Sequence, residues 1–228
     1  MTPLKVSYVQ ANGDCAVLIF FKPHPQQTYR LQTLAHYIRQ QRVEGIVDVV
    51  PALDSLMLMF DQPSRIDDRI MSGIEEACEE SAGLIFEPQI HEIPVCYHPQ
   101  VASDLDAVLK QTGLGLKELI ASHSQARYTV SFLGFLPGFA YLSGLPKSLH
   151  LNRKPVPGRQ TPAGSVAIAN RQTGLYALNS PAGWYVIGCT PVTLFDRESP
   201  HVLPYQPLDI IKFKPINLDQ FEQERLND

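Results

Sequence analysis

The residues whose types could do chemistry gather in three proline- and glycine-rich segments in the second half of this 228-residue chain. In residues 134–141, with the sequence GFLPGFAY, Gly138 directly follows Pro137. This order predicts a type II turn with a positive φ at the glycine, which would place aromatic rings around a tight backbone. Such a turn could form the apolar wall of a ligand pocket, or its rings could simply fill the mouth of a barrel.

Two further segments, residues 162–176 and 180–191, each join a turn of small residues to a strand and leave hydroxyl or amide groups beside it. These groups could converge at one end of a barrel and bind an amide or a carboxylate, although each alone also suits a turn that hydrogen-bonds its own backbone. Together with the aromatic turn they form the predicted substrate-binding set, which consists of Phe135, Pro137, Gly138, Tyr141, Ser165, Gln172, Thr173, Tyr176, Ser180, Trp184 and Thr190.

The elements that must position these segments differ between the two halves of the chain. Up to about residue 83, strand and helix periods alternate, which predicts an α+β sandwich with its helices on one face of the sheet. The second helix is expected to begin at Ser64 as its N-cap and to end at Gly83. The strands of this half are predicted at residues 5–10, 15–21, 46–50 and 55–60.

Beyond residue 125, short apolar runs are broken by proline and glycine, a pattern typical of a compact all-β barrel. Two short helices, near Ser103 and Leu116, are expected to precede the barrel. We therefore predict an α+β N-terminal domain over residues 1–88 and an all-β barrel C-terminal domain over residues 89–228. The strands of the second half are predicted at residues 91–97, 128–134, 165–169, 175–178, 184–188 and 210–213.

Composition and general motifs argue against several classes of protein. The net charge is −4 and no basic block is present, so nucleic acid is not expected as a partner. Residues 1–13 do not have the basic start and continuous apolar core of a signal peptide, and no apolar run approaches the roughly 20 residues that span a bilayer, so we expect a cytoplasmic protein without membrane contact. The four cysteines form no CxxC pair, so no metal site is predicted.

Five segments resemble motifs of the KipI/allophanate hydrolase subunit 1 family. They are NGDCAVLIFF, HEIPVCYHPQVASDLDAVL, GFLPGFAYLSGLP, TPAGSVAIANRQTGLY and SPAGWYVIGCTPVTLFD. The resemblance covers essentially the whole chain in order. It implies an N-terminal α+β domain followed by a cyclophilin-like β-barrel, in agreement with the two halves described above.

The resemblance also implies a function. Members of this family act in an ATP-dependent 5-oxoprolinase, which opens 5-oxo-L-proline to L-glutamate with ATP hydrolysis, and the chain alone is expected to be inactive. The implied partners are a paralogous subunit of the KipA/PxpC type and a subunit of the LamB/YcsF type. ATP with magnesium would be a co-substrate, and no biotin is expected on this chain.

Two alternatives follow from the same family. One is an inhibitor of a sensor histidine kinase, for which residues 135–141 could supply an exposed aromatic patch. The other is the carboxyltransferase component of a urea-carboxylase or allophanate-hydrolase system, which would need a biotin carrier on another chain.

Catalytic candidates follow from the chemistry that the resemblance implies. A lactam amide is a poor electrophile, so ATP would phosphorylate its oxygen, and this transfer needs cations and oriented hydrogen-bond donors. We predict Arg153, Arg159 and His123 as catalytic residues. Each arginine would also suit a solvated loop, and His123 would also suit a cation at a helix C-terminus. Cys189 stands where relatives usually carry an arginine, and a thiol cannot replace a bidentate guanidinium.

Overall fold

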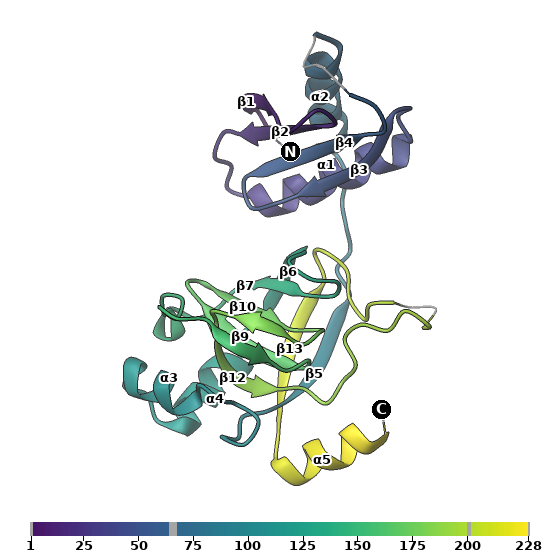
Figure 1. Cartoon of the computed structure of the whole chain (residues 1–228). Helices are drawn as coiled ribbons and strands as arrows, with labels where there is room; N and C mark the ends of the chain where they lie inside the picture. The colour runs from purple at the N-terminus through teal and green to yellow at the C-terminus, as the bar shows by residue number, and fades with distance from the viewer. Residues whose placement is uncertain (1, 64–67, 200–201, 228) are drawn as a thin grey trace. The chain divides into compact units, whose positions relative to one another are not determined.

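The computed structural model describes residues 2–63, 68–199 and 202–227. The chain divides into two compact units, Met1–Glu87 and Pro88–Asp228 (Figure 1). The predicted division after residue 88 lies one residue from this boundary. Within the described residues, no helix combines the length and the apolar character needed to cross a membrane.

The N-terminal unit is an antiparallel sheet covered by two helices. Alternate residues of the second strand, among them Val17 and Ile19, are buried, so only one face of the sheet carries the core. The two helices pack on this face, which confirms the α+β prediction for this half; the predicted cap at Ser64 lies outside the described residues. The sheet order is β1-β2-β4-β3, and the elements are β1 (Val6–Ala11), β2 (Ala16–Phe21), α1 (Gln27–Gln41), β3 (Ile46–Pro51), β4 (Ser55–Phe60) and α2 (Asp68–Ser81).

The C-terminal unit is built on a closed seven-stranded barrel, which confirms the predicted barrel. Its inward-facing side chains, such as Val130, Leu142 and Ile168, form one apolar core. The strand order around the barrel is β10-β7-β6-β13-β5-β12-β9. The strands are β5 (Ile90–Cys96), β6 (Tyr128–Leu133), β7 (Ala140–Ser143), β9 (Ser165–Ala169), β10 (Gln172–Leu175), β12 (Tyr185–Cys189) and β13 (Ile210–Ile216).

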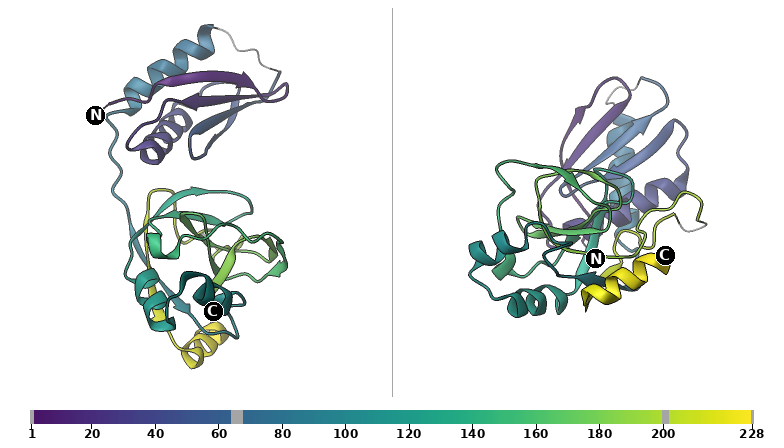
Figure 2. Two further views of the ribbon diagram at one scale, coloured as in Figure 1. Left: turned by 90° about the vertical axis from the view of Figure 1, so that its left-hand side faces the viewer. Right: turned by 60° about the horizontal axis from the view of Figure 1, so that its bottom comes forward.

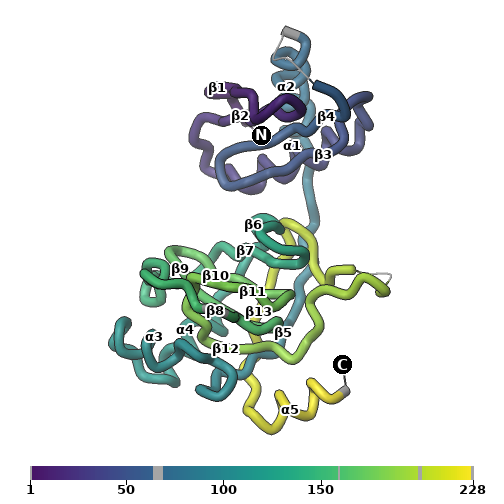
Figure 3. Tube along the Cα trace, in the orientation of Figure 1, coloured from purple at the N-terminus to yellow at the C-terminus, as the bar shows by residue number. Residues whose placement is uncertain are grey.

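A two-stranded sheet, β8 (Gly158–Thr161) with β11 (Ser180–Ala182), accompanies the barrel (Figure 3). Ala182 of β11 packs with Ala167 and Trp184, which lie on the outer side of the barrel wall. The short strands β7, β8 and β11 were not predicted. The strand predicted at residues 175–178 is wrong, because the chain reverses at Asn170, with φ 52°, and β10 therefore begins three residues earlier.

The described part of this unit also contains three α-helices and a 3-10 turn, so it is not purely β. α3 (Leu105–Thr112) and α4 (Leu116–Ser124) match the two predicted short helices, whereas α5 (Leu218–Asn227) was not predicted. The turn η1 spans Lys147–Leu149. Phe221 of α5 packs on Cys96 and Cys189, so this helix lies against the outside of the barrel (Figure 2).

Candidate functional site

The barrel wall separates the predicted ligand-binding residues into an inner and an outer group. On β9, Val166 and Ile168 belong to the barrel core, whereas Ala167 belongs to a second apolar cluster on the outside. Tyr141, Tyr176 and Trp184 pack with this second cluster, which we call the outer cluster. Three separate sequence motifs therefore do meet on one face of the barrel.

Phe139 occupies the centre of the outer cluster. Its ring centroid lies 4.6 Å from that of Tyr141, 4.8 Å from Tyr176 and 5.8 Å from Trp184, each in an edge-on arrangement. A Cβ added at Gly174 would lie 2.7 Å from Phe139 Cζ, so this glycine makes the close ring packing possible. Phe139, Tyr176 and Trp184 are each at most 5% exposed, so these rings fill a packed core and do not line an open wall.

The predicted type II turn is present at residues 136–139. The N–H of Phe139 donates to Leu136 O over 3.1 Å, and Gly138 has φ +78°. The hydroxyl of Tyr205 donates to Gly138 O over 3.0 Å and holds the turn from the barrel side. Phe135, just before this turn, has φ 72° and is 61% exposed, and Pro137 is also exposed.

Two of the predicted hydroxyl residues are buried without a hydrogen-bond partner among the described residues. They are Ser165, at the start of β9, and Ser180, at the start of β11. An unpaired buried hydroxyl lowers the free energy of unfolding by about 1–3 kcal/mol. Gln172, by contrast, is only half-buried at the first position of β10.

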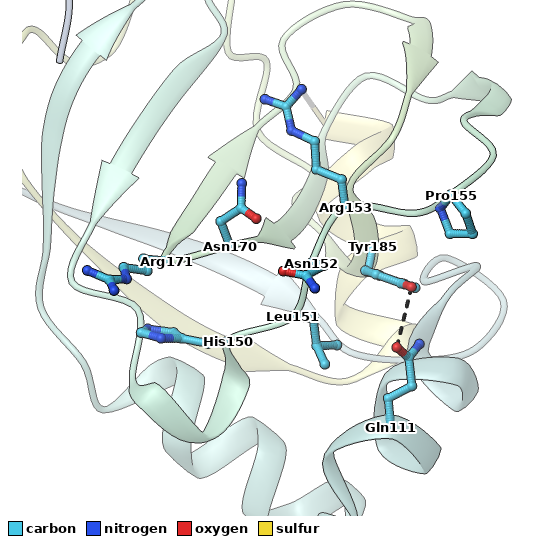
Figure 4. A pocket seen from close by; sticks show the side chains of 9 residues that line it. All are labelled: Gln111, His150, Leu151, Asn152, Arg153, Pro155, Asn170, Arg171 and Tyr185. Carbon is cyan, nitrogen blue, oxygen red and sulfur yellow. Dashed lines mark hydrogen bonds between the residues drawn. The ribbon is translucent and has the colours of Figure 1, made fainter.

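Beside the outer cluster lies a cavity of about 590 Å³ with a strongly basic lining, here called the arginine pocket (Figure 4). Arg153 and Arg171 line it, and neither forms an ion pair with a described carboxylate. No Asp or Glu is among the lining residues that the structure describes. The lining residues are Gln111, His150, Leu151, Asn152, Arg153, Pro155, Asn170, Arg171 and Tyr185.

The loop that carries Arg153 is fastened on both sides. Lys154 Nζ donates to Asp104 Oδ2 over 2.9 Å, and the Val186 N–H donates to the same oxygen over 2.9 Å. The N–H of Lys154 also donates to Gly183 O over 2.8 Å. Lys154 is therefore held in a structural ion pair, which leaves Arg153 as the loop cation that can meet a ligand.

Arg153 also connects the pocket with the outer cluster electrostatically. Burial raises the pKa of the Tyr141 and Tyr176 phenols, and the nearby Arg153 guanidinium opposes this rise. Both phenols therefore stay protonated near neutral pH and can donate hydrogen bonds. Neither phenol lines the pocket, so Arg153 is the link between the pocket and the outer cluster.

His123 and Thr173 belong to the inner group, away from this pocket. His123 is fully buried; its Nδ1 lies 2.7 Å from the Tyr97 hydroxyl and its Nε2 lies 3.2 Å from Thr173 Oγ1. Burial lowers the pKa of His123 to about 3, so the imidazole is neutral and the interpretation as a helix-terminal cation is wrong. A ligand on the outer face of the barrel does not reach either side chain.

The other two predicted residues lie at separate places. Arg159 is in β8, whose backbone pairs with β11. Thr190 lines a second, smaller cavity of about 290 Å³ together with Cys189 and with Arg225 of α5. Arg225 escaped the sequence analysis because α5 was not predicted, although Leu218 and Phe221 have helical spacing.

Several lining residues of the arginine pocket were also missed. The missed residues are His150 and Asn152, in the loop before β8, and Asn170, in the turn between β9 and β10. A hydrogen bond from the Asn170 N–H to Leu151 O, over 2.5 Å, joins these two segments. The one local signal in the sequence was the pair Asn170-Arg171 between two strand-like runs, because asparagine is common in tight turns.

The chain matches a known family along most of its length. The family described as carboxyltransferase domain, subdomain C and D, matches residues 7–204. The B subunit of the 5-oxoprolinase from Escherichia coli O157:H7 is 34% identical over 205 residues, which cover 89% of this chain and 93% of that protein. Its counterpart from Bacillus subtilis is 36% identical over 223 residues, 92% of each chain.

More distant and structural matches agree with this placement. The urea amidolyase of Saccharomyces cerevisiae is 24% identical over an alignment of 254 residues. The alignment covers 96% of this chain and 14% of that protein. The crystal structure of TTHA0988 superimposes with a TM-score of 0.76 and 31% identity, over 89% of this chain. The present chain corresponds to only 39% of the TTHA0988 chain.

Proposed function

Because the chain belongs to the family of carboxyltransferase domains, subdomains C and D, we propose that it acts as the B subunit of a 5-oxoprolinase complex. The complex would convert 5-oxo-L-proline to L-glutamate with hydrolysis of ATP, and this chain would contribute only together with its partners. The partners would be subunits of the KipA/PxpC and LamB/YcsF types. The similarity to proteins that carry this name, over about nine-tenths of the chain, supports the proposal.

The observation that carries the proposal is the arginine pocket. Both 5-oxoproline and ATP are anions, and a guanidinium without a carboxylate partner can bind a carboxylate or phosphate through two parallel hydrogen bonds. Arg153 and Arg171 have no such partner among the described residues, and no acid lines the pocket to compete with a ligand. The pocket therefore suits one of the two anionic substrates.

The residues of this pocket would act by position and charge. Arg153 and Arg171 would hold the anion, and the amides of Asn152 and Asn170, which also line the pocket, would donate hydrogen bonds to it. Phosphorylation of a lactam oxygen spreads negative charge over the transferred group, and fixed cations stabilise that charge. No group of three His, Cys, Asp or Glu side chains that could hold a metal lies within the described residues, so no magnesium ligands are assigned to this chain.

The test is 5-oxoproline-dependent ATP hydrolysis by the assembled complex with Arg153→Gln and Arg171→Gln. Loss of a charged hydrogen bond of about 1.5–3 kcal/mol corresponds to roughly a tenfold to hundredfold loss of kcat/KM in each variant. Arg197→Gln is the matched control, because Arg197 lies over the Phe195 ring and lines neither cavity. Full activity in both pocket variants would remove the arginine pocket from the proposal.

A carboxyltransferase activity is the second candidate, and the matches to urea amidolyases favour it. It requires a carboxylated biotin carrier as the donor, because the carboxyl group must arrive bound to a cofactor. A discharge assay, in which a carboxybiotin carrier is mixed with this chain and a paralogous subunit, separates the candidates. Substrate-dependent loss of the carboxyl group would favour this activity, whereas ATP-dependent ring opening without biotin would favour the first.

A further inference from the structure

Two of the four cysteines lie directly opposite each other at one joint of the barrel wall. Cys96 is the last residue of β5, Cys189 is the last residue of β12, and the two are antiparallel partners. They are the single pair that joins these two strands among the described residues, whereas seven pairs join β5 to β13 on its other side. The two cysteines are therefore the place where β5 and β12 meet, here called the seam.

The backbone geometry of this pair suits a disulfide. Residues directly opposite each other in an antiparallel pair have Cα atoms about 4.5–5.5 Å apart and side chains on the same face of the sheet. Disulfides span Cα separations of about 4.4–6.8 Å. Both side chains pack with Phe221 of α5 in one apolar cluster, so they lie on the same side of the seam. Both thiols are free in this structure, and they can join with little movement of the backbone.

The fold keeps both thiols away from solution and uncharged. Cys96 is 1% exposed and Cys189 is 8% exposed, and α5 packs on both. Burial raises the pKa of both thiols, that of Cys189 to about 11. Two charges on α5 act in opposite directions, because Glu222 adds to the rise at Cys96 and Arg225 opposes the rise at Cys189; a backbone hydrogen bond of His98 also opposes the rise at Cys96. Reaction with an oxidant therefore requires α5 to open locally.

A covalent bond at the seam would enclose the arginine pocket. The chain between Cys96 and Cys189 carries α3, α4 and every described residue that lines that pocket. A cross-link that closes a loop of roughly 100 residues reduces the conformational freedom of the unfolded chain and so favours the folded state. The bond would therefore stabilise the unit that carries the pocket.

We propose that Cys96 and Cys189 are a reversible modification site, at which a low-molecular-weight disulfide such as glutathione disulfide oxidises the two thiols to one disulfide across the seam. α5 opens before the first thiol reacts. The site does not depend on the proposed 5-oxoprolinase activity, because its formation requires neither a substrate nor a partner subunit of that complex.

The oxidation takes place in two exchange steps. The thiolate of Cys189, the more exposed of the two, attacks one sulfur of glutathione disulfide, the bond between the two glutathione sulfurs breaks, and one glutathione thiolate leaves. The Cys96 thiolate then attacks the Cys189 sulfur and displaces the second glutathione thiolate. Two protein sulfurs are oxidised, two glutathione sulfurs are reduced, and the two protons of the protein thiols pass to the glutathione thiolates. Excess reduced glutathione reverses both steps.

Equilibration of the full chain in glutathione buffers tests the proposal. The chain carries Cys15→Ser and Cys78→Ala, so that the two cysteines of the seam are its only thiols. One sample is refolded from urea in each buffer, so that the thiols equilibrate before α5 covers them, and a second sample stays in urea. Acid quenching and peptide mass spectrometry measure the fraction of linked peptide. The folded chain is expected to form the bond at a glutathione ratio at least about tenfold more reducing than the unfolded chain requires.

Thermal unfolding and a variant of α5 give two further readouts. The linked chain should unfold several degrees above the reduced chain, and dithiothreitol should abolish this difference. Starting from the reduced, folded chain, Phe221→Ala should speed formation of the bond by about tenfold, because the ring no longer holds α5 on the thiols. Leu226→Ala is the matched control on the same helix, because Leu226 is 87% exposed.

Three results would count against the proposal. A folded chain that is oxidised no more readily than the unfolded chain, or a bond that lowers the unfolding temperature, would overturn the site itself. Equal rates in Phe221→Ala and Leu226→Ala would overturn the control of access by α5.

Discussion

His123 is a polar side chain whose surroundings, not its position at the end of α4, decide its state. Both ring nitrogens are hydrogen-bonded inside the barrel, and the ring stacks on Phe213 with a centroid separation of 4.7 Å. Because burial favours the neutral imidazole, the pKa falls from 6.5 to about 3. The folded chain therefore holds His123 as the unprotonated imidazole, and protonation of this ring favours the unfolded chain.

This linkage predicts an acid-sensitive fold. The stabilisation from neutral His123 is complete above the unfolded pKa of about 6.5 and is lost as the pH falls toward about 3, because only the unfolded chain takes up the proton in that range. Urea unfolding between pH 7.5 and 4 measures this loss as the fall in the free energy of unfolding. The fall should be less steep in His123→Gln than in the wild type, by up to roughly 1.4 kcal/mol per pH unit. His24→Gln, in the N-terminal unit, is the control; identical pH slopes in wild type and His123→Gln would contradict the prediction.

Gly174 shows how one missing methyl group permits the outer cluster. Ala at this position would place a Cβ 2.7 Å from Phe139 Cζ and 2.9 Å from Trp184 Cζ3. We expect Gly174→Ala to destabilise the chain by about 1–3 kcal/mol and to change the emission of Trp184, which is the only tryptophan. Gly134→Ala is the matched control, because an added Cβ there meets nothing within 4 Å. Equal stability and emission in the two variants would show that the packing is looser than described.

At the scale of elements, Asp104 joins α3, β12 and the loop of residues 150–155. Its carboxylate receives both the Lys154 ammonium and the Val186 N–H. Removing the ammonium leaves the carboxylate with the Val186 N–H and the Ser103 hydroxyl as partners, and it removes one of the two contacts that fasten the loop carrying Arg153. We therefore expect the ion pair to hold the loop that supplies Arg153 to the arginine pocket.

The variant Lys154→Met tests this role of the ion pair. Amide hydrogen exchange of residues 150–155 should accelerate by about tenfold, because the loop opens locally while the barrel core stays protected. In the assembled complex, KM for the substrate bound in the pocket should rise several-fold with little change in kcat. Lys147→Met, in η1, is the control. Unchanged exchange in the loop would mean that the contact of Lys154 N–H with Gly183 O suffices to hold it.

Elements with strong local patterns could be predicted from the sequence, whereas elements that depend on tertiary contacts could not. Residues 55–60 and 165–169 are apolar runs, and both are strands. β8 and β11 are only four and three residues long, and they form because they pair with each other outside the barrel. Such pairing leaves no periodic signal in the sequence.

The candidate site was only partly predictable for the same reason. The proline- and glycine-rich motifs contain the rings of the outer cluster, and the turn at Pro137-Gly138 was predicted because turn residues are local signals, but the packing of these rings on the outside of the barrel was not predicted. The arginine pocket needs the contact between Asn170 and Leu151, and the smaller cavity beside Thr190 needs Arg225 of α5 to come close to Cys189. These contacts are long-range, and residue types alone do not indicate them.

At the scale of the whole molecule, every predicted site residue lies in the unit Pro88–Asp228. Phe135, exposed in a left-handed backbone conformation, leaves an aromatic ring on the surface of this unit, and such a ring is suited to a partner interface. The chain corresponds to 39% of the TTHA0988 chain.

Whether this chain is an obligatory component of a 5-oxoprolinase is tested by omitting single components from the complex. 5-Oxoproline-dependent ATP hydrolysis is measured with the KipA/PxpC-type and LamB/YcsF-type partners, leaving out each chain in turn. We expect activity only in the complete mixture and none from this chain alone. Full activity of the two partners without this chain, or no activity in a complete mixture whose partners work with the Bacillus subtilis relative, would contradict it.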